Sequence, residues 1–199
     1  MLLSTNPIAA AIPAGAEAPI VLDMATTVAA YGKVKAKAQR GEMMPEGWMM
    51  DRQGRPLLDP KRSEEGFLLP IGGYKGYGLS LVVGLLAGTL NGAAMGKDVI
   101  DFNHDDNSVT NTGQAIAILD PAAFGDVNHF KRQVDVLIRD IRGSERIPGV
   151  ERIWLPGEQS QARRSAYLRD GIPIPAGLLQ TLDKLAEQLK VPALRDTTP

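Results

Sequence analysis

The 199-residue chain has no cysteine and only two histidines, His104 and His129. Without thiols it can form no disulfide, no thiolate metal site and no cysteine nucleophile, which is compatible with a cytoplasmic protein. The net charge of -1 offers no basic surface for nucleic acid or an anionic membrane, so we expect neither partner. A hydrophobic content of 44% predicts an ordinary soluble globular protein.

Several familiar signals are also missing. The first 15 residues have no basic region, and Pro7 and Pro13 interrupt their apolar run, so we predict no signal peptide. The apolar run 79–90 is too short to span a bilayer. The sequence has no P-loop, and no Gly-x-Gly-x-x-Gly follows an expected strand. A nucleotide site would therefore need other residues.

The most informative stretch is 68–90, where a glycine-rich loop leads into an apolar segment. The loop 71–78 holds four glycines and Lys75, and 79–90 is long enough for a buried helix. Backbone N–H groups, the positive end of the helix dipole and Lys75 can together bind an anion. Alternatively, the glycines only permit a tight turn and close packing, and Lys75 is solvated.

A second strand-to-helix junction follows the apolar run 18–24, which predicts a strand buried on both faces. Asp23 lies near the end of this run, and Thr26 and Thr27 precede an expected helix over 28–40. These polar groups either cap the helix or face a ligand.

A third junction is the turn 156–158, which closes an expected strand at 150–155. Gly157 and Glu158 open the next expected helix. From spacing alone, the favoured interpretation is a capped turn in which Glu158 interacts with the positive end of the helix.

The remaining elements follow from periodicity and turn residues. Segment 41–60 predicts a loop with a hairpin-like turn, whose methionines either fill gaps or line a pocket. The acidic segment 101–106 matches no calcium or zinc spacing, so a solvated loop is favoured over a metal site. Further strands are expected at 8–12 and 114–119, and further helices at 127–141, 160–169 and 178–189.

Together, these stretches resemble the malate/L-lactate dehydrogenase family that lies outside the Rossmann-fold lactate dehydrogenases and includes ureidoglycolate dehydrogenase, diketogulonate reductase and piperideine-2-carboxylate reductase. The shared motifs keep the family's order from Ser4 to about Leu189. They are STNPIAAAIP at 4–13, VLDMATT at 21–27, PEGW at 45–48, LLPIGGYKGYGLSLVVGLLAG at 68–88, GQAIAILDPAAF at 113–124, PGVERIWLPGE at 148–158 and GIPI at 171–174.

The resemblance implies an oxidoreductase that transfers a hydride between NAD(P) and a small 2-hydroxy or 2-oxo acid, or a related cyclic imino acid. It also implies an α/β protein of the α+β type, with a mixed, largely antiparallel sheet flanked by helices and a non-Rossmann dinucleotide site. The cofactor-binding portion would span 1–190, with a flexible tail at 191–199. The family's cofactor contacts fall on Asp23, Met24, Ala25, Thr26, Thr27, Tyr74, Lys75, Gly157 and Glu158.

One departure from the family bears on catalysis. In the family, the Ser/Thr-Asn-Pro segment follows a long, mainly helical part that carries a proton-transferring histidine and a carboxylate-binding arginine. Here that segment begins at Ser4, and neither His104 nor His129 matches the catalytic position. We therefore expect a C-terminal portion with no catalytic residue of its own.

Two functions follow from that expectation. One is an incomplete dehydrogenase, and the other is a non-catalytic dinucleotide-binding or assembly module. Because an incomplete fold would leave apolar surface and strand edges open, we expect a homodimer or association with the missing N-terminal half.

Overall fold

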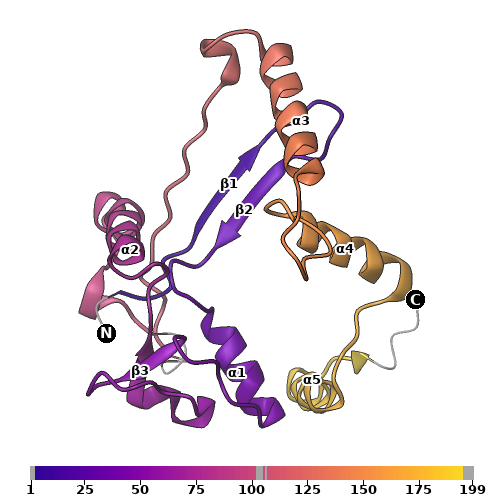
Figure 1. Ribbon diagram of the computed structural model, residues 1–199. Coiled ribbons are helices and arrows are strands. Elements are labelled where there is room, and N and C mark those ends of the chain that lie inside the picture. Colours follow the sequence, from indigo (N-terminus) through magenta and orange to yellow (C-terminus); the bar gives the residue numbers. More distant parts are fainter. Residues whose placement is uncertain (1–2, 102–104, 106, 195–199) are drawn as a thin grey trace. The chain divides into compact units, whose positions relative to one another are not determined.

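A computed structural model describes residues 3–101, 105 and 107–194 (Figure 1). It divides into two compact units, 1–156 and 157–199. The described residues combine helices with two small antiparallel sheets of two strands each. This confirms the mixed helix and strand architecture with antiparallel pairing. The prediction of a cofactor-binding portion over 1–190 with a flexible tail stays a prediction, and 195–199 lie outside the described residues.

The first sheet is a hairpin of β1 (Ile8–Ile12) and β2 (Ile20–Met24), whose register pairs Ile8 with Met24 (Figure 1). Both predicted strands are confirmed, although β2 begins two residues late. The prediction that the second strand is buried on both faces is wrong, because Val21 and Asp23 are exposed. A two-stranded hairpin has too little neighbouring structure to cover both of its faces.

Helix α3 (Val127–Gly143) packs beside this hairpin, as the apolar spacing over 127–141 predicted. The Asp126 side chain caps its first turn by accepting the N–H of Asn128. Val134 and Ile138 on its inner face form a core with Leu155, and Ala14, Ile20 and Ile141 pack around them.

A buried carboxylate also joins α3 to the β1–β2 turn. Asp135 is 5% exposed, and its two oxygens accept the backbone N–H groups of Gly15, Ala16 and Glu17 at 2.9 to 3.1 Å. These hydrogen bonds lower the pKa of the Asp135 carboxyl, and the bond from the N–H of Ala16 has the largest effect.

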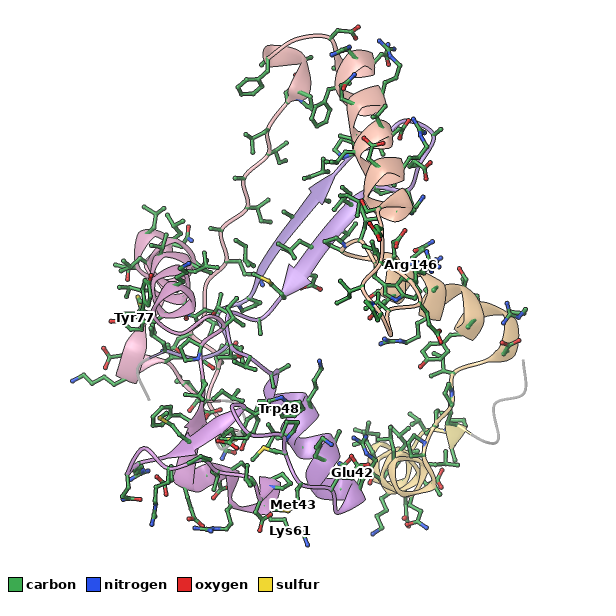
Figure 2. All side chains as sticks on the ribbon, viewed as in Figure 1. Glu42, Met43, Trp48, Lys61, Tyr77 and Arg146 are labelled. Carbon is green, nitrogen blue, oxygen red and sulfur yellow. The ribbon has the colours of Figure 1, made fainter. Side chains whose placement is uncertain are left out.

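A second core lies under α1 (Tyr31–Arg40). Val34 packs there with Met44, Met49 and Leu57, and Trp48, labelled in Figure 2, covers the cluster. Two of the methionines therefore fill gaps in a core, which is one of the two uses expected for them. The small sheet of this region pairs β3 (Met49–Asp51) with β4 (Gly66–Leu68), and the predicted turn follows β3.

Helix α1 begins at Tyr31, three residues later than predicted. Its N-cap is Ala30, and no side chain caps it. The interpretation of Thr26 and Thr27 as caps of this helix is therefore wrong. The residues before α1 instead pair with the chain at 69–71.

Helix α2 (Tyr74–Ala87) confirms the predicted helix, but the prediction of its burial is wrong. Tyr77, Val82, Leu85 and Leu86 on this helix are between 44% and 55% exposed. The sequence of α2 is apolar around the whole circumference, a pattern typical of fully buried helices. No element of the described chain covers those four side chains.

Two predicted strands do not form. Segments 114–119 and 150–155 carry no strand assignment and join no sheet of the described residues. A strand is defined by ladder pairing, and the described chain shows no ladder at either segment, although Pro156, just after the second, accepts the N–H of Val21 in β2.

The second unit holds α4 (Glu158–Asp170) and α5 (Ala176–Leu189), which confirm the last two predicted helices. The short 3-10 turns of the first unit are η1 (Pro60–Glu65), η2 (Thr89–Asn91), η3 (Gly96–Asp98) and η4 (Pro121–Ala123). None of the helices in the described residues combines the length and the hydropathy that a membrane span requires.

Candidate functional site

The first predicted corner, residues 23–27, leaves β2 and is held from within by Thr26. This residue is fully buried, and both its N–H and its Oγ donate to the carbonyl oxygen of Thr5, at 2.8 and 3.0 Å. The hydroxyl of Thr27 donates to the carbonyl oxygen of Ala29 at 2.8 Å. Both hydroxyl protons are therefore used inside the protein, whereas Asp23 remains exposed on β2.

The structure brings this corner beside the glycine-rich loop. The N–H of Ile71 donates to the carbonyl oxygen of Thr26 at 3.0 Å, and the N–H of Val28 donates to that of Leu69 at 2.8 Å. Between these bonds, Thr27 and Pro70 form an isolated antiparallel bridge. Two of the three predicted corners thus lie side by side, although they are more than 40 residues apart in the sequence.

The glycines of the loop set its path into α2. Gly72 and Gly73 have φ values of 57° and 63°, in the left-handed region that favours glycine. Gly76 is buried, and a Cβ there would lie 2.0 Å from the carbonyl oxygen of Ile71. The expected structural use of the glycines is therefore confirmed. It also leaves Gly73 as the N-cap of α2, so no side chain caps the first turn.

The charged groups of these two corners are accessible. Lys75 is exposed and forms no ion pair with any described residue, and Tyr74 beside it is 80% exposed. The carboxylate of Asp23 has no hydrogen-bond partner among the described residues. An anion bound at these two corners could therefore interact with a cation and with the positive end of a helix. A ligand with hydroxyl or amide donors could hydrogen-bond to the carboxylate.

A further contact, which the sequence did not single out, ties the N-terminal segment to α2. The Asn6 side chain donates to the carbonyl oxygen of Ser80 at 2.9 Å, and Asn6 has a φ of 22°, unusual for a residue other than glycine. Ser80 is buried, and its hydroxyl oxygen has no hydrogen-bond partner among the described residues. In the sequence, the Asn6-Pro7 turn was the only sign that Asn6 has a structural role, and it did not indicate that Ser80 is its hydrogen-bond partner.

The third predicted corner belongs to the second unit. Gly157, with φ of 91°, is the N-cap of α4, and Glu158 is the first residue of that helix. The carbonyl oxygen of Pro156, the last residue of the first unit, accepts the N–H of Val21 in β2 at 3.2 Å. The capped-turn interpretation is confirmed in part, since Glu158 occupies the first turn of a helix whose cap is a glycine.

The other candidates from the sequence are the two histidines and the acidic segment 101–106. His129 is exposed in the first turn of α3, and His104 lies outside the described residues, as does Asp106. The Asp105 carboxylate accepts the N–H groups of Asn107 and Ser108, and hydrogen bonds from Ser108 lower its pKa. In the described ranges, no three acidic or histidine side chains are grouped to hold a metal ion.

Two cavities lie away from the predicted site residues. A cavity of about 580 Å³ lies beyond the C-terminal end of α2, between residues 91–94 and 111–113. Another, of about 330 Å³, lies in the second unit between α4 and Ile172. The candidate site therefore rests on the two converging corners, which form an open surface.

Comparison with known proteins identifies the family. The sequence model of the family described as malate/L-lactate dehydrogenase matches residues 1–183. The chain belongs to the malate/L-lactate dehydrogenase family. The resemblance noted in the sequence is thereby confirmed.

The curated relatives that the chain matches are about twice as long as the matched region. The chain is 37% identical to malate dehydrogenase of Pyrococcus abyssi, over 97% of this chain and 54% of the relative. It is 32% identical to ureidoglycolate dehydrogenase (NAD(+)) of Escherichia coli K12, over 89% of this chain and 50% of the relative. It thus spans about half the length of these curated relatives and corresponds to a C-terminal portion of them.

A solved family structure shares the fold. Sulfolactate dehydrogenase from Methanocaldococcus jannaschii superposes with a TM-score of 0.78 at 32% identity. The match covers 98% of this chain and 55% of that chain. The fold of the matched portion is therefore that of a dehydrogenase of this family.

Proposed function

We propose that this chain binds a nicotinamide dinucleotide at the two converging corners and is the cofactor-binding portion of an NAD(P)-dependent dehydrogenase. One observation carries the proposal. The uncapped N-terminus of α2 and Lys75, which has no ion-pair partner among the described residues, adjoin the Asp23–Thr27 corner through the bond between Thr26 and Ile71. An anionic group with neighbouring hydroxyls fits that combination.

Each predicted residue has a role in this proposal. Lys75 and the first-turn N–H groups beside Tyr74 hold the pyrophosphate, and Asp23 accepts from ribose hydroxyls or the carboxamide. Met24, Ala25 and Thr27 line the same corner, while buried Thr26 positions it. Gly157 and Glu158 belong to the second unit, and we propose them as cofactor-binding residues on the family resemblance alone. The bound nicotinamide would supply or accept the hydride.

The relatives support a proposal for the substrate class. Malate, sulfolactate and ureidoglycolate, named for the similar proteins, are all small 2-hydroxy acids. We propose such an acid, its 2-oxo form or a cyclic imino acid as substrate of the complete enzyme. We also propose a cytoplasmic location and a non-Rossmann site, consistent with the absence of Gly-x-Gly-x-x-Gly.

The proton that accompanies hydride transfer needs its own donor. A general acid must lie within hydrogen-bond reach of the reacting oxygen, and it must be held there. His129 lies in the first turn of α3, on a different element from either corner. We therefore propose that the proton donor is outside these residues, in the N-terminal portion of the family fold.

Fluorescence titration of the purified chain with NADH and with NADPH tests the binding site. Lys75→Ala should weaken binding about tenfold, the equivalent of about 1.4 kcal/mol. Lys61→Ala is the matched control, because Lys61 is an exposed lysine of η1 (Figure 2). Because Lys75 acts by charge, the difference between the two variants should shrink at high salt. Equal affinity of both variants would refute the role of Lys75.

A turnover assay addresses the second part of the proposal. The chain with NADPH and pyruvate should show binding without oxidation of NADPH. Turnover by the chain alone would refute an external proton donor, and absence of dinucleotide binding would refute the whole proposal. Binding without turnover also fits a non-catalytic module, so the two are separated by restoring the N-terminal portion and assaying again.

A further inference from the structure

Residues Ala115–Leu119, here called the open strand, lie in the extended, unpaired segment that runs between α2 and α3 (Figure 1). Ile116 is 86% exposed and Ile118 is 92% exposed. No backbone N–H or C=O group of the open strand is hydrogen-bonded to any described residue. Five apolar residues thus present both their side chains and their backbone to solvent.

The composition of the open strand is that of an interior strand. Successive side chains of an extended chain point to opposite faces, so the run Ala-Ile-Ala-Ile-Leu is apolar on both. Such runs occur where strands pair on both edges and are covered on both faces. The composition of the open strand is therefore suited to two neighbouring strands and two covering layers.

The exposed side chains of α2, here called the α2 face and comprising Tyr77, Val82, Leu85 and Leu86, are connected to the open strand. The Asn91 side chain donates to the carbonyl oxygens of Leu86 and Ala87 and also to that of Gln114, at 2.8 to 3.2 Å. Gly113 packs so closely that a Cβ would lie 2.1 Å from the carbonyl oxygen of Ala87. The open strand thus starts at the C-terminal end of α2.

We propose that the open strand and the α2 face together form the docking surface for the N-terminal portion of the family fold. That portion is the part of each relative that this chain does not match, between 45% and 50% of the relatives' length. It is large enough to supply both strands and cover. A second copy bound about a twofold axis pairs only one edge of a given strand, which leaves the other edge and the α2 face open.

The path of the chain supports this occupant. In the relatives, the unmatched portion precedes the segment that corresponds to Ser4–Pro7. Here the Asn6 side chain is fixed on α2 through the carbonyl oxygen of Ser80. A portion that precedes this segment therefore arrives at α2. The inference rests on family membership and not on dinucleotide binding, so the two can fail separately.

Hydrogen exchange, without any dinucleotide present, tests the docking surface. The first sample is the full chain alone, and the second is a fusion that adds the N-terminal portion of the M. jannaschii sulfolactate dehydrogenase before Met1. Amides of the open strand should exchange at the unprotected rate in the chain alone and at least about 100-fold more slowly in the fusion. Light scattering of the chain alone reports its oligomeric state.

Two matched variants locate the effect. Ile118→Lys should abolish the added protection in the fusion without changing the melting of the chain alone, because the side chain is 92% exposed there. Ile147→Lys, at a similarly exposed isoleucine outside the surface, should leave the protection intact. A fusion carrying Lys75→Ala should also remain protected, which separates docking from cofactor binding.

Three results would overturn the proposal. The open strand could already be protected in a dimer of the chain alone, which would make a second copy the occupant. It could remain unprotected in the fusion and in a second fusion made with the E. coli ureidoglycolate dehydrogenase portion. Finally, Ile118→Lys and Ile147→Lys could have equal effects.

Discussion

Helices α3 and α2 belong to the same unit, but the inner apolar face of α3 is buried, whereas many of the apolar residues of α2 are exposed. Helix α3 has one apolar face, and that face is buried against the β1–β2 hairpin through Val134 and Ile138. Helix α2 is apolar all round, yet Val82 and Leu86 are about half exposed. The distribution of apolar residues around a helix indicates which of its faces are suited to burial. The mismatch at α2 is the observation on which the proposed docking surface rests, whereas α3 shows a completed contact.

The largest expected effect is at the completed contact. Ile138 is 1% exposed, so Ile138→Ala should lower the free energy of unfolding by about 3 kcal/mol. Leu137→Ala, the adjacent position at 52% exposed, should cost less than about 1 kcal/mol. Urea unfolding followed by circular dichroism measures both. Similar costs at the two positions would mean that α3 is not packed as described.

Acid should loosen the same contact. Hydrogen bonds from Ala16, Glu17 and Gly15 lower the folded pKa of Asp135, so its stabilisation is present above the unfolded pKa near 4 and is lost as pH falls through the lower folded value. Asp135→Asn should lower the Tm by about 5 °C at pH 7 and flatten the fall of Tm below pH 4. Asp140→Asn, on the same helix, serves as the control. Parallel Tm curves for wild type and Asp135→Asn would exclude this role.

A smaller effect is expected where the hairpin approaches this carboxylate. A Cβ on Gly15 would lie 2.6 Å from Oδ2 of Asp135, so Gly15→Ala should destabilise the chain by about 1 kcal/mol. Gly32 in α1 has nothing within 4 Å of the added carbon, and Gly32→Ala should stabilise by about 0.5 kcal/mol. Thermal unfolding distinguishes the opposite signs.

The smallest effect is expected at the mismatched helix. Leu86→Ala should cost only about 0.5 kcal/mol in the chain alone, because nearly half of the side chain is already in water. In the fusion with the N-terminal portion, the same substitution should cost several times more. Urea unfolding of both forms measures the difference. An equal cost in both would remove α2 from the docking surface.

The sequence predicted elements best where the signal is local. The helix 127–141 and the strand 8–12 were predicted from periodicity and turn residues, and both formed with bounds close to those expected. The strand 114–119 failed because strand formation requires a partner, and its apolar pattern could not reveal that none is among the described residues. The same reason explains the wrong burial of α2 and of the second strand.

The candidate site divides in the same way. The motifs at 21–27, 68–88 and 148–158 pointed to the family, which the comparisons confirm, and they supplied the residues of the proposed cofactor site. Cofactor contact at those residues stays a proposal. The pairing of Thr26 with Ile71 could not be predicted, because nothing in either segment specifies the other.

Local sequence alone determined which segments are helices and where glycine is required, because both depend on short-range sterics. It also determined the family to which the chain belongs, because the family is identified by motifs. Tertiary structure alone decided that the Thr26 corner adjoins the Gly72–Gly73 loop, that Asp135 binds the β1–β2 turn and that α2 is left half exposed. Those outcomes depend on contacts between segments distant in sequence, whose free energy is gained only when the partner segment is present.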